Sequence, residues 1–301
     1  MRDESLNYIC FDIGGTFVKH AVITGDGVIC TQDTFSTVHE SKELFIASLL
    51  CIIRQYEKAF TIQGVGVSMP GVVDPETGLS ITAGAVYPLY GENVLHSLQA
   101  EVTYPVVIEN DANCALLAEK LNGKAVDNTD VVLLTIGTGI GGAIMVNNQL
   151  IHGHQFKSGE FGMMRIDHAR HPNKTLHELA STTALVQMYK DRFGNIEPIN
   201  GKEIMQKMRQ EKEVAQVVDE WAENIGVAIF NIATFMNPEK ILIGGGISAD
   251  ALLLPTVLKA LDKNIHWHDF GVPIDICQHE NNAGLLGALY CLLHKPITIQ
   301  K

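Results

Sequence analysis

Apolar residues recur along the chain with two different periods. Short, continuous apolar runs bounded by glycine, proline or polar turns predict buried strands, and apolar residues repeated every three or four positions predict helices. The predicted strands are residues 7–12, 63–69, 106–108, 131–136 and 240–246. The predicted helices are residues 41–59, 111–121, 212–236 and 283–293. The sequence therefore predicts an α/β protein.

One arrangement of these elements occurs twice. The strand at 7–12 is followed by the glycine loop GGT and a hairpin around a Gly-Asp-Gly turn. The strand at 131–136 is followed by GTGIGG and a hairpin around Asn147-Asn148. A repeated unit of this kind suggests a duplicated fold with a cleft between its halves.

Composition limits the classes of function. The 301-residue chain is 46% apolar and 19% charged, as expected for a globular protein. Its formal charge of −12 repels nucleic-acid phosphates, so nucleic acid is a poor candidate partner. No apolar run reaches membrane-spanning length, no signal peptide precedes the first strand, and the six cysteines are scattered without a CxxC pair. We therefore expect a cytoplasmic protein with free thiols and no membrane partner.

Three glycine loops follow predicted strands, at 14–16, 137–142 and 244–246. Glycine lets the backbone approach an anion and present N–H groups to it, so three such loops favour phosphate binding. The second loop has the spacing GxGxxG, but a β-hairpin follows it where a dinucleotide-binding fold needs a helix. This argues against a Rossmann oxidoreductase, and the absence of a Walker A motif argues against a P-loop NTPase.

The charged residues near these loops each have two interpretations. Asp12 is either a turn residue after its strand or a carboxylate that holds Mg²⁺ through water. Lys19 is either a solvated hairpin charge or a phosphate contact. Asn110 and Asp111 suit the N-cap of the next helix, and a carboxylate at the same place also suits removal of a hydroxyl proton. Spacing alone does not choose between these interpretations.

Six motifs occur in one order along nearly the whole chain. They are DIGGTFVK at 12–19, GVSMPGVVDPETG at 66–78, ENDANCALLAE at 109–119, TIGTGIGGAI at 135–144, SGEFG at 158–162 and IGGGIS at 243–248. Together they resemble the ROK family (repressors, open reading frames and sugar kinases). The resemblance implies the actin-like, ribonuclease-H-like fold, with two α/β lobes around a central cleft, and a homodimer, as in many members. The implied lobes are residues 1–110, joined by the C-terminal helix 284–301, and residues 111–283.

The resemblance also assigns roles to single residues. Asp111 matches the catalytic aspartate, which also contacts the sugar. The other matching sugar-binding positions are Gly71, Asn110 and Glu160, with His177 and Glu178 close to a further sugar-contacting glutamate of the family. The expected ATP-binding positions are Gly14, Gly15, Thr16, Lys19, Thr138, Gly139, Gly245 and Gly246. The implied cofactors are ATP and Mg²⁺, the latter at Asp12.

The chain departs from the family pattern near residue 163. Typical members continue as GExGH and then carry a cysteine cluster that binds structural zinc. Here Met163 stands at the histidine position, and residues 164–176 contain no cysteine. We interpret His168, His171 and His177, which lack cysteine partners, as solvated or capping residues and expect no structural zinc.

These observations favour a kinase. Family repressors carry an N-terminal helix-turn-helix, for which no room remains before Gly14. The expected reaction is transfer of the γ-phosphoryl group of Mg-ATP to a primary sugar hydroxyl. The zinc-less GEFGMM form most resembles the β-glucoside kinase branch, so cellobiose or a related β-glucoside is the expected substrate, with N-acetylmannosamine kinase and glucokinase as alternatives.

Two further points stay open. A sugar-sensing protein without turnover is the alternative of another class, and the intact Asp12, Asp111 and glycine loops argue against it. The aromatic run YPLY at 87–90 is compatible either with stacking on a sugar face or with packing inside its loop.

Overall fold

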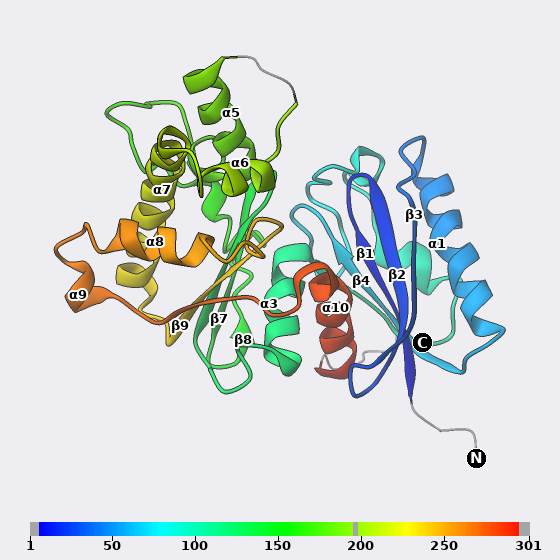
Figure 1. Cartoon of the computed structure of the whole chain (residues 1–301). Coiled ribbons are helices and arrows are strands. Elements are labelled where there is room, and N and C mark those ends of the chain that lie inside the picture. Colours follow the sequence, from blue (N-terminus) through cyan, green and yellow to red (C-terminus); the bar gives the residue numbers. More distant parts are fainter. Residues whose placement is uncertain (1–5, 195–197, 295–301) are drawn as a thin grey trace. The chain divides into compact units, whose positions relative to one another are not determined.

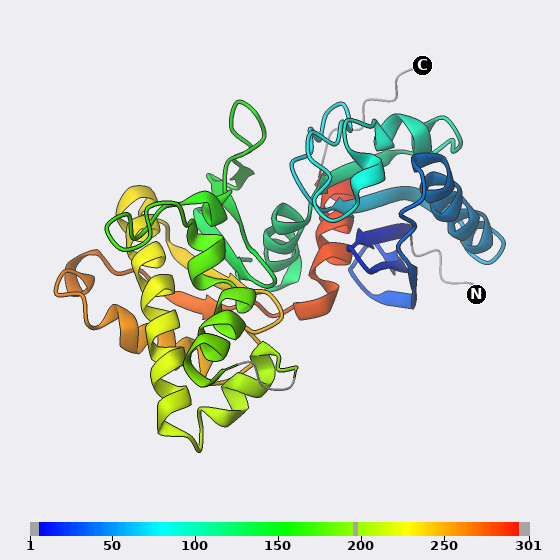
Figure 2. The same ribbon diagram turned by 90° about the horizontal axis from the view of Figure 1, so that it is seen from above.

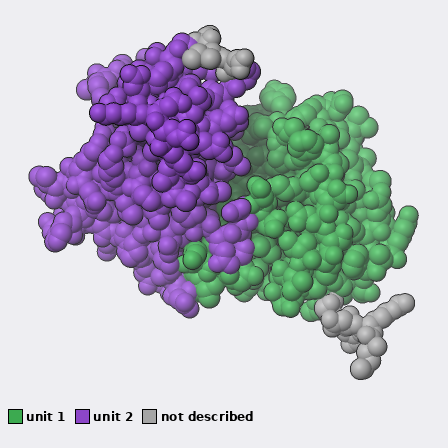
Figure 3. Space-filling model, in the orientation of Figure 1, with its two compact units in different colours: residues 1–126, 153–157, 281–301 green, residues 127–152, 158–280 purple. Residues whose placement is uncertain are grey.

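The computed structural model describes residues 6–194 and 198–294, which form two compact units (Figures 1 and 3). Unit 1 contains residues 1–126, 153–157 and 281–301. Unit 2 contains residues 127–152 and 158–280. Among the described residues, no helix combines the length and the apolar character that crossing a bilayer requires.

Unit 1 is built on a mixed five-stranded sheet with the strand order β3-β2-β1-β4-β5. Its strands are β1 (Asn7–Ile13), β2 (Phe17–Thr24), β3 (Ile29–Ser36), β4 (Ile62–Met69) and β5 (Val106–Asn110). Its helices are α1 (Lys42–Glu57), α2 (Val94–Gln99), α3 (Asp111–Asn122) and α10 (Ala283–His294), with the 3-10 turn η1 (Tyr87–Leu89). The first three strands are antiparallel neighbours, and β1, β4 and β5 run parallel.

Strand β1 contributes side chains to two cores. Phe11 packs in the core that includes Phe45 of α1, whereas Cys10 packs in the core that includes Cys114 of α3 and Leu285 of α10. Successive side chains of a strand point to opposite faces, so helices cover both faces of this sheet. Figure 2 shows the red helix α10 beside α3.

The boundary between the units differs from the predicted one. The sequence placed it after residue 110, but α3 belongs to unit 1. The reason is the close packing of α3 on α10, where a Cβ on Gly287 would collide with the carbonyl group of Cys114. The predicted C-terminal helix 284–301 joins unit 1 through α10, and residues 295–301 lie outside the described part of the chain.

Unit 2 contains a second mixed five-stranded sheet, with the order β10-β9-β6-β7-β8. Its strands are β6 (Val131–Ile136), β7 (Ile140–Val146), β8 (Gln149–Leu150), β9 (Lys240–Gly244) and β10 (Ile274–Ile276). Its helices are α4 (Leu176–Ala180), α5 (Thr182–Phe193), α6 (Gly201–Lys207), α7 (Lys212–Met236), α8 (Leu253–Leu261) and α9 (Trp267–Phe270). The 3-10 turn η2 (Phe161–Met163) also belongs to this unit, and η3 (Glu280–Asn282) lies where the chain passes back into unit 1. The core centres on α7, with its fully buried Trp221.

The predicted duplication is confirmed. In each unit the first strand pairs antiparallel with the strand after its glycine loop, β1 with β2 and β6 with β7. On its other side the first strand pairs parallel with a later strand, β4 or β9, and one more parallel strand follows. Each glycine loop therefore lies at the carboxyl end of the central strand of its sheet.

Candidate active site

Asn110 and Asp111 lie at the junction of β5 and α3. The side-chain oxygen of Asn110 accepts hydrogen bonds from the backbone N–H groups of Ala112 and Asn113, at 2.9 and 3.0 Å, and so caps the helix. Asp111 is exposed, and its carboxylate accepts the side-chain amide of Asn110 at 2.9 Å and the N–H of Ala112 at 2.8 Å. The cap is therefore assigned to Asn110, and the exposed carboxylate at the positive end of α3 belongs to Asp111.

A buried framework holds this junction. The Asn110 amide also donates to the carbonyl oxygen of Gly71, 2.8 Å away. Gly71 has φ +86°, and a Cβ there would collide with the carbonyl oxygen of Thr82, so glycine is required at this turn. Beneath it, the fully buried Glu109 accepts from the backbone N–H of Asn110 and the side chain of Asn113, each at 3.0 Å. The predicted sugar-binding residues Gly71, Asn110 and Asp111 thus form one connected group.

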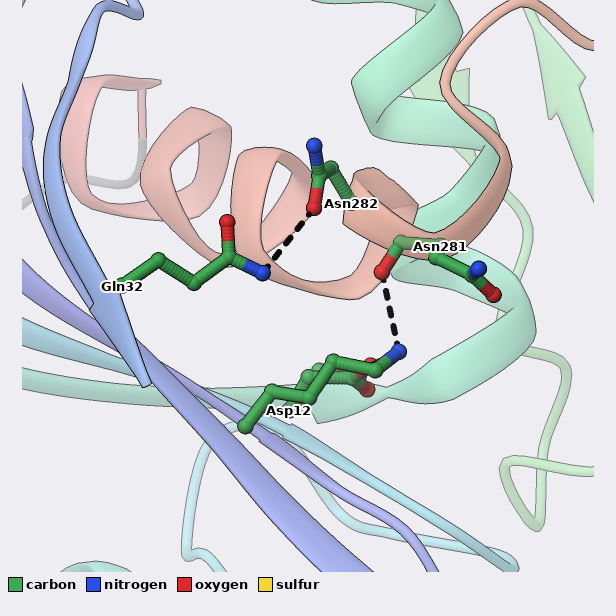
Figure 4. Close-up of polar contacts among 6 residues, drawn as sticks. Asp12, Gln32, Asn281 and Asn282 are labelled. Atoms are coloured by element: carbon green, nitrogen blue, oxygen red, sulfur yellow. Dashed lines mark hydrogen bonds and ion pairs between the residues drawn. The ribbon is translucent and has the colours of Figure 1, made fainter. Parts of the chain in front are cut away.

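Asp12 lies next to the first glycine loop and has two donors. Its carboxylate accepts from the Ser68 hydroxyl at 3.0 Å and from the Lys19 ammonium at 3.1 Å. The Lys19 ammonium also donates to the carbonyl oxygen of Asn281 at 2.9 Å (Figure 4). The start of α10 closes over this carboxylate, because a Cβ on Gly284 would collide with it.

The donor chemistry at Asp12 fits Mg²⁺ bound through water. Its side chain remains 19% exposed, and Mg²⁺ in proteins takes few carboxylates and keeps several waters. The positive charge of Lys19 beside Asp12 disfavours direct coordination and favours a water between carboxylate and metal. The same ammonium is close to the loop at 14–16, since Lys19 lies directly opposite Asp12 in the register of β1 and β2.

The carbonyl oxygens of the first glycine loop are all engaged. Gly14 accepts from the Thr37 hydroxyl at 2.7 Å, Gly15 from the His39 imidazole at 2.8 Å, and Thr16 from the Thr37 backbone N–H at 2.9 Å. Because a carbonyl accepts only, His39 must carry its proton on the bonded Nε2. Oxygens that would repel a phosphate are thus tied to donors of the protein.

The second glycine loop, in unit 2, shows the same feature. Gly137 accepts from the Thr182 backbone N–H at 2.8 Å, Thr138 from the Thr183 hydroxyl at 2.8 Å, and Gly139 from the N–H of Gly137 at 2.9 Å. The donors to Gly137 and Thr138 come from the start of α5, and the donor to Gly139 comes from the loop itself. The carbonyl oxygens of residues 14–16 and 137–139 are therefore held by donors of the protein, so that they are turned away from an anion bound at either loop.

His177 and Glu178 have different surroundings. The Nδ1 atom of His177 accepts the backbone N–H of Ile140 at 2.8 Å, and its ring fills the space beside Gly139 and Gly162. Glu178 is exposed and closes the capping box of α4, where it accepts the Thr175 N–H and hydroxyl, each at 2.6 Å. The Thr175 hydroxyl and backbone hydrogen bonds lower the pKa of Glu178. The geometry connects His177 to the second loop and Glu178 to its own helix.

Glu160 and the third glycine loop pack on the same sheet. Glu160 is half-buried at the start of η2, and its neighbours Gly159 and Phe161 both contact Gly142 of β7. Gly245 has φ +93° and lies against the backbone of Ile136, the residue before Gly137. Gly246 is exposed with open space around its Cα. Unit 2 thus brings together Thr138, Gly139, Gly245 and Gly246 at the ends of β6 and β9.

The histidines near residue 168 make local contacts. The Nδ1 atom of His168 accepts from the Arg165 guanidinium at 2.6 Å, and the backbone N–H of His171 donates to the carbonyl oxygen of Asp167. Across residues 6–194 and 198–294, no group of three or more His, Cys, Asp or Glu residues could hold a metal ion. The absence of zinc from the functional protein stays a prediction.

Some supporting residues escaped the sequence analysis. Thr37 and His39 reach the first loop from the chain after β3, and no sequence spacing connects them to it. Thr182 and Thr183 follow Ser181, a cap residue that accepts from the N–H of Ala184. The run Ser-Thr-Thr therefore indicates a helix start, and the donors of that start bind the carbonyl oxygens of the second glycine loop. Glu109 is the first residue of the ENDANCALLAE motif, and the sequence pattern assigns it no role of its own.

Comparison with known proteins identifies the family. The sequence profile of the ROK family matches residues 8–295. The chain is 36% identical to the β-glucoside kinase of Listeria monocytogenes, over 95% of this chain and 97% of that one. A crystal structure of a ROK family protein from Streptococcus pneumoniae in complex with sucrose matches with a TM-score of 0.86 and 30% identity, covering 96% of this chain and 98% of that one.

A second structure includes the nucleotide. The ROK family glucokinase of Streptomyces griseus, in complex with glucose and AMPPNP, matches with a TM-score of 0.80 and 26% identity, covering 94% of this chain and 98% of that one. The actin-like, two-lobed fold predicted from the sequence is thereby confirmed, and the class of protein is that of ATP-dependent sugar kinases. The chain belongs to the ROK family.

Proposed function

We propose that this sugar kinase is a β-glucoside kinase, which transfers the γ-phosphoryl group of Mg-ATP to a primary hydroxyl of a β-glucoside such as cellobiose. The observation that carries the catalytic part is the arrangement at residue 111. The carboxylate there is exposed at a helix start and oriented by Asn110, whose other contacts fix it to the turn at Gly71. The Listeria β-glucoside kinase, at 36% identity, supports the choice of sugar.

In the proposed reaction, Asp111 acts as general base. The sugar hydroxyl oxygen attacks the γ-phosphorus as its proton passes to the Asp111 carboxylate, and the bond from the γ-phosphorus to the bridging oxygen breaks to release ADP. Asn110 keeps the carboxylate in position, so little reorganisation is needed in the transition state. Backbone N–H groups of the loops at 14–16, 137–139 and 244–246 bind the phosphates.

Mg²⁺ would be held by Asp12 through water and would supply positive charge to the phosphates. Lys19 would add a second cation beside the first loop while it keeps Asp12 in place. Glu160 would bind sugar hydroxyls, as its match to the family motif implies. We assign His177 to the support of the second loop, because its Nδ1 is occupied by Ile140, and Glu178 to the cap of α4.

The test compares sugars directly. ADP release with Mg-ATP is measured on cellobiose, glucose and N-acetylmannosamine, without added zinc. We expect the highest kcat/KM on cellobiose. Preference for glucose or N-acetylmannosamine would retain the kinase and its base but overturn the β-glucoside assignment in favour of the two alternatives named above. Sugar binding without ADP formation would instead favour the non-catalytic sensor.

Two further properties are proposed on different grounds, the first on the resemblance to the family and the second on the cysteine usage. We propose a homodimer, which light scattering of the purified protein would test against a mass of 32.9 kDa for one chain. We also propose a cytoplasmic location, where ATP is available and the thiols of Cys10, Cys30, Cys51, Cys114, Cys277 and Cys291 stay reduced.

A further inference from the structure

Two tyrosines on the turn η1 form an exposed aromatic face. Tyr87 is 80% exposed and Tyr90 is 59% exposed, although the two residues flank the fully buried Leu89. Their rings are stacked, with 6.1 Å between the centroids and 12° between the planes. Two large rings held against each other in solvent leave apolar ring surface uncovered, and such a pair is a candidate contact for a ligand.

The segment that carries the rings has a fixed shape. Its ends are joined by hydrogen bonds from Ser80 to Glu92 and from Gly91 to Ser80, at 2.9 and 2.8 Å. Inside it, Val86 and Leu89 are buried and anchor the turn to the core of unit 1. The tyrosines are therefore presented on a rigid support, so that little conformational entropy is lost when a ligand covers them.

The same segment touches both functional parts of unit 1. Thr82 and Gly84 lie against Gly71, the residue that receives the amide of Asn110. Ala85 lies against Gly15 of the first phosphate loop, close enough that a Cβ on Gly15 would be 2.6 Å from that of Ala85. Tyr87 follows Ala85 by two residues, which limits the distance between their Cα atoms to about 7 Å. The segment that carries the tyrosines is therefore continuous with the turn that holds Asn110 and with the first phosphate loop.

We propose that Tyr87 and Tyr90 bind the second ring of a β-glucoside, the glucosyl unit next to the one that is phosphorylated. A β-linked glucose unit carries its substituents equatorially and presents flat C–H faces, and such a face stacks on the outward face of a phenol ring. An α-linked disaccharide is bent at its linkage and does not offer the same extended face. This inference rests on the proposed function, and it names the residues that distinguish a disaccharide from a monosaccharide.

The test compares cellobiose with methyl β-glucoside, which has the reacting glucose but no second ring. In Tyr87→Ala and Tyr90→Ala we expect KM for cellobiose to rise about tenfold with kcat nearly unchanged, because the contact is remote from the reacting hydroxyl. KM for methyl β-glucoside should change less than twofold. Tyr87→Phe and Tyr90→Phe should behave like wild type, since the ring face does the binding. Phe270→Ala, which removes an aromatic ring of unit 2 that is 54% exposed, is the matched control.

Other substrates identify what covers the rings. Maltose, with its α-linkage, should be insensitive to both alanine variants. Phenyl β-glucoside distinguishes two kinds of site. In the alanine variants its KM should rise as much as that of cellobiose if the site stacks on any ring, and less if the site is specific for a sugar ring. An equal rise in KM for cellobiose and methyl β-glucoside, or no rise in KM for either, would overturn the proposal.

Failure of the proposed function gives a different result. If the wild-type protein releases no ADP with any sugar, titration calorimetry measures the affinity for cellobiose and for methyl β-glucoside without the need for turnover. A preference for cellobiose that disappears in the Tyr87→Ala/Tyr90→Ala double variant supports the aromatic subsite in a non-catalytic protein. A wild-type protein that binds both glucosides equally has no such subsite.

Discussion

The side-chain amide of Asn110 lies within hydrogen-bonding distance of two oxygens, the carbonyl of Gly71 at 2.8 Å and the carboxylate of Asp111 at 2.9 Å. The oxygen of the same side chain caps α3. One asparagine thus starts the helix, ties it to the turn at Gly71 and orients the carboxylate. The capping and catalytic interpretations of this short run are compatible, because neighbouring residues take the two roles.

Asp111→Asn tests the general base. The amide retains an oxygen that can accept the Ala112 N–H, so the melting temperature should stay close to that of wild type. Without a carboxylate to take the proton, kcat should fall about 10²–10⁴-fold. Steady-state ADP release and thermal unfolding measure both quantities. Glu101→Gln, which neutralises another exposed acid of unit 1, should leave kcat unchanged, and a near-wild-type rate for Asp111→Asn would remove Asp111 from the mechanism.

Asn110→Ser and Asn110→Ala separate orientation from capping. Serine is a good N-cap but cannot replace the amide that bonds Gly71 and Asp111, so kcat should fall while most of the stability remains. Alanine also loses the cap, which should lower the free energy of unfolding by a further amount of roughly 0.5–2 kcal/mol. Denaturant unfolding and ADP release distinguish the two. If serine preserves kcat, the amide has no role in orienting Asp111.

The elements around this site were largely predictable, and their long-range contacts were not. Strand β6 and helix α7 match their predicted ranges, because a continuous apolar run and a long apolar stripe are local signals. The membership of α3 in unit 1 depends on α10, which follows more than 150 residues later. Likewise, the donors that hold the first loop, Thr37 and His39, become neighbours of Gly14 only through the pairing of β2 with β3.

Gly15→Ala tests the first phosphate loop. The new methyl group would lie 2.6 Å from the Cβ of Ala85, so the loop or its neighbour must move. Overpacking of this kind costs about 1–3 kcal/mol, and we expect KM for ATP to rise about tenfold. Ala85→Gly removes the obstructing carbon, so the double variant should recover most of the affinity. Failure of Ala85→Gly to rescue would show that glycine at 15 is needed for ligand approach and not for packing.

His177→Asn tests whether the imidazole supports the second loop. Its Nδ1 accepts the N–H of Ile140, and an asparagine oxygen can occupy a similar position. His177→Ala leaves that donor unpaired, at a cost of about 1–3 kcal/mol, and should raise KM for ATP. Asparagine should restore both the melting temperature and KM for ATP. If asparagine restores stability but raises KM for the sugar alone, the imidazole contacts substrate.

His20 should make the stability of unit 1 depend on pH. Its imidazole is packed among Phe11, Phe35 and Tyr56, bonds the Tyr56 hydroxyl at 2.7 Å, and lies opposite Asp33 in the next strand. Burial lowers the pKa of His20 below its ordinary value of 6.5, with partial opposition from the Asp33 carboxylate. The unfolded chain therefore binds this proton more tightly than the folded one.

The contribution of His20 to the free energy of unfolding is fully present above pH 6.5. It is lost as the pH falls below that value toward the lower pKa of the folded state. His20→Phe keeps an aromatic ring in the cluster and removes the titration. Urea unfolding at several pH values between 7.5 and 5 should show a smaller loss of stability for His20→Phe than for wild type. Parallel losses in the two proteins would mean that other groups, such as surface carboxylates, account for the whole pH dependence. A steeper loss in the variant would require a raised pKa for His20, because only a folded state that binds the proton more tightly is stabilised by acid.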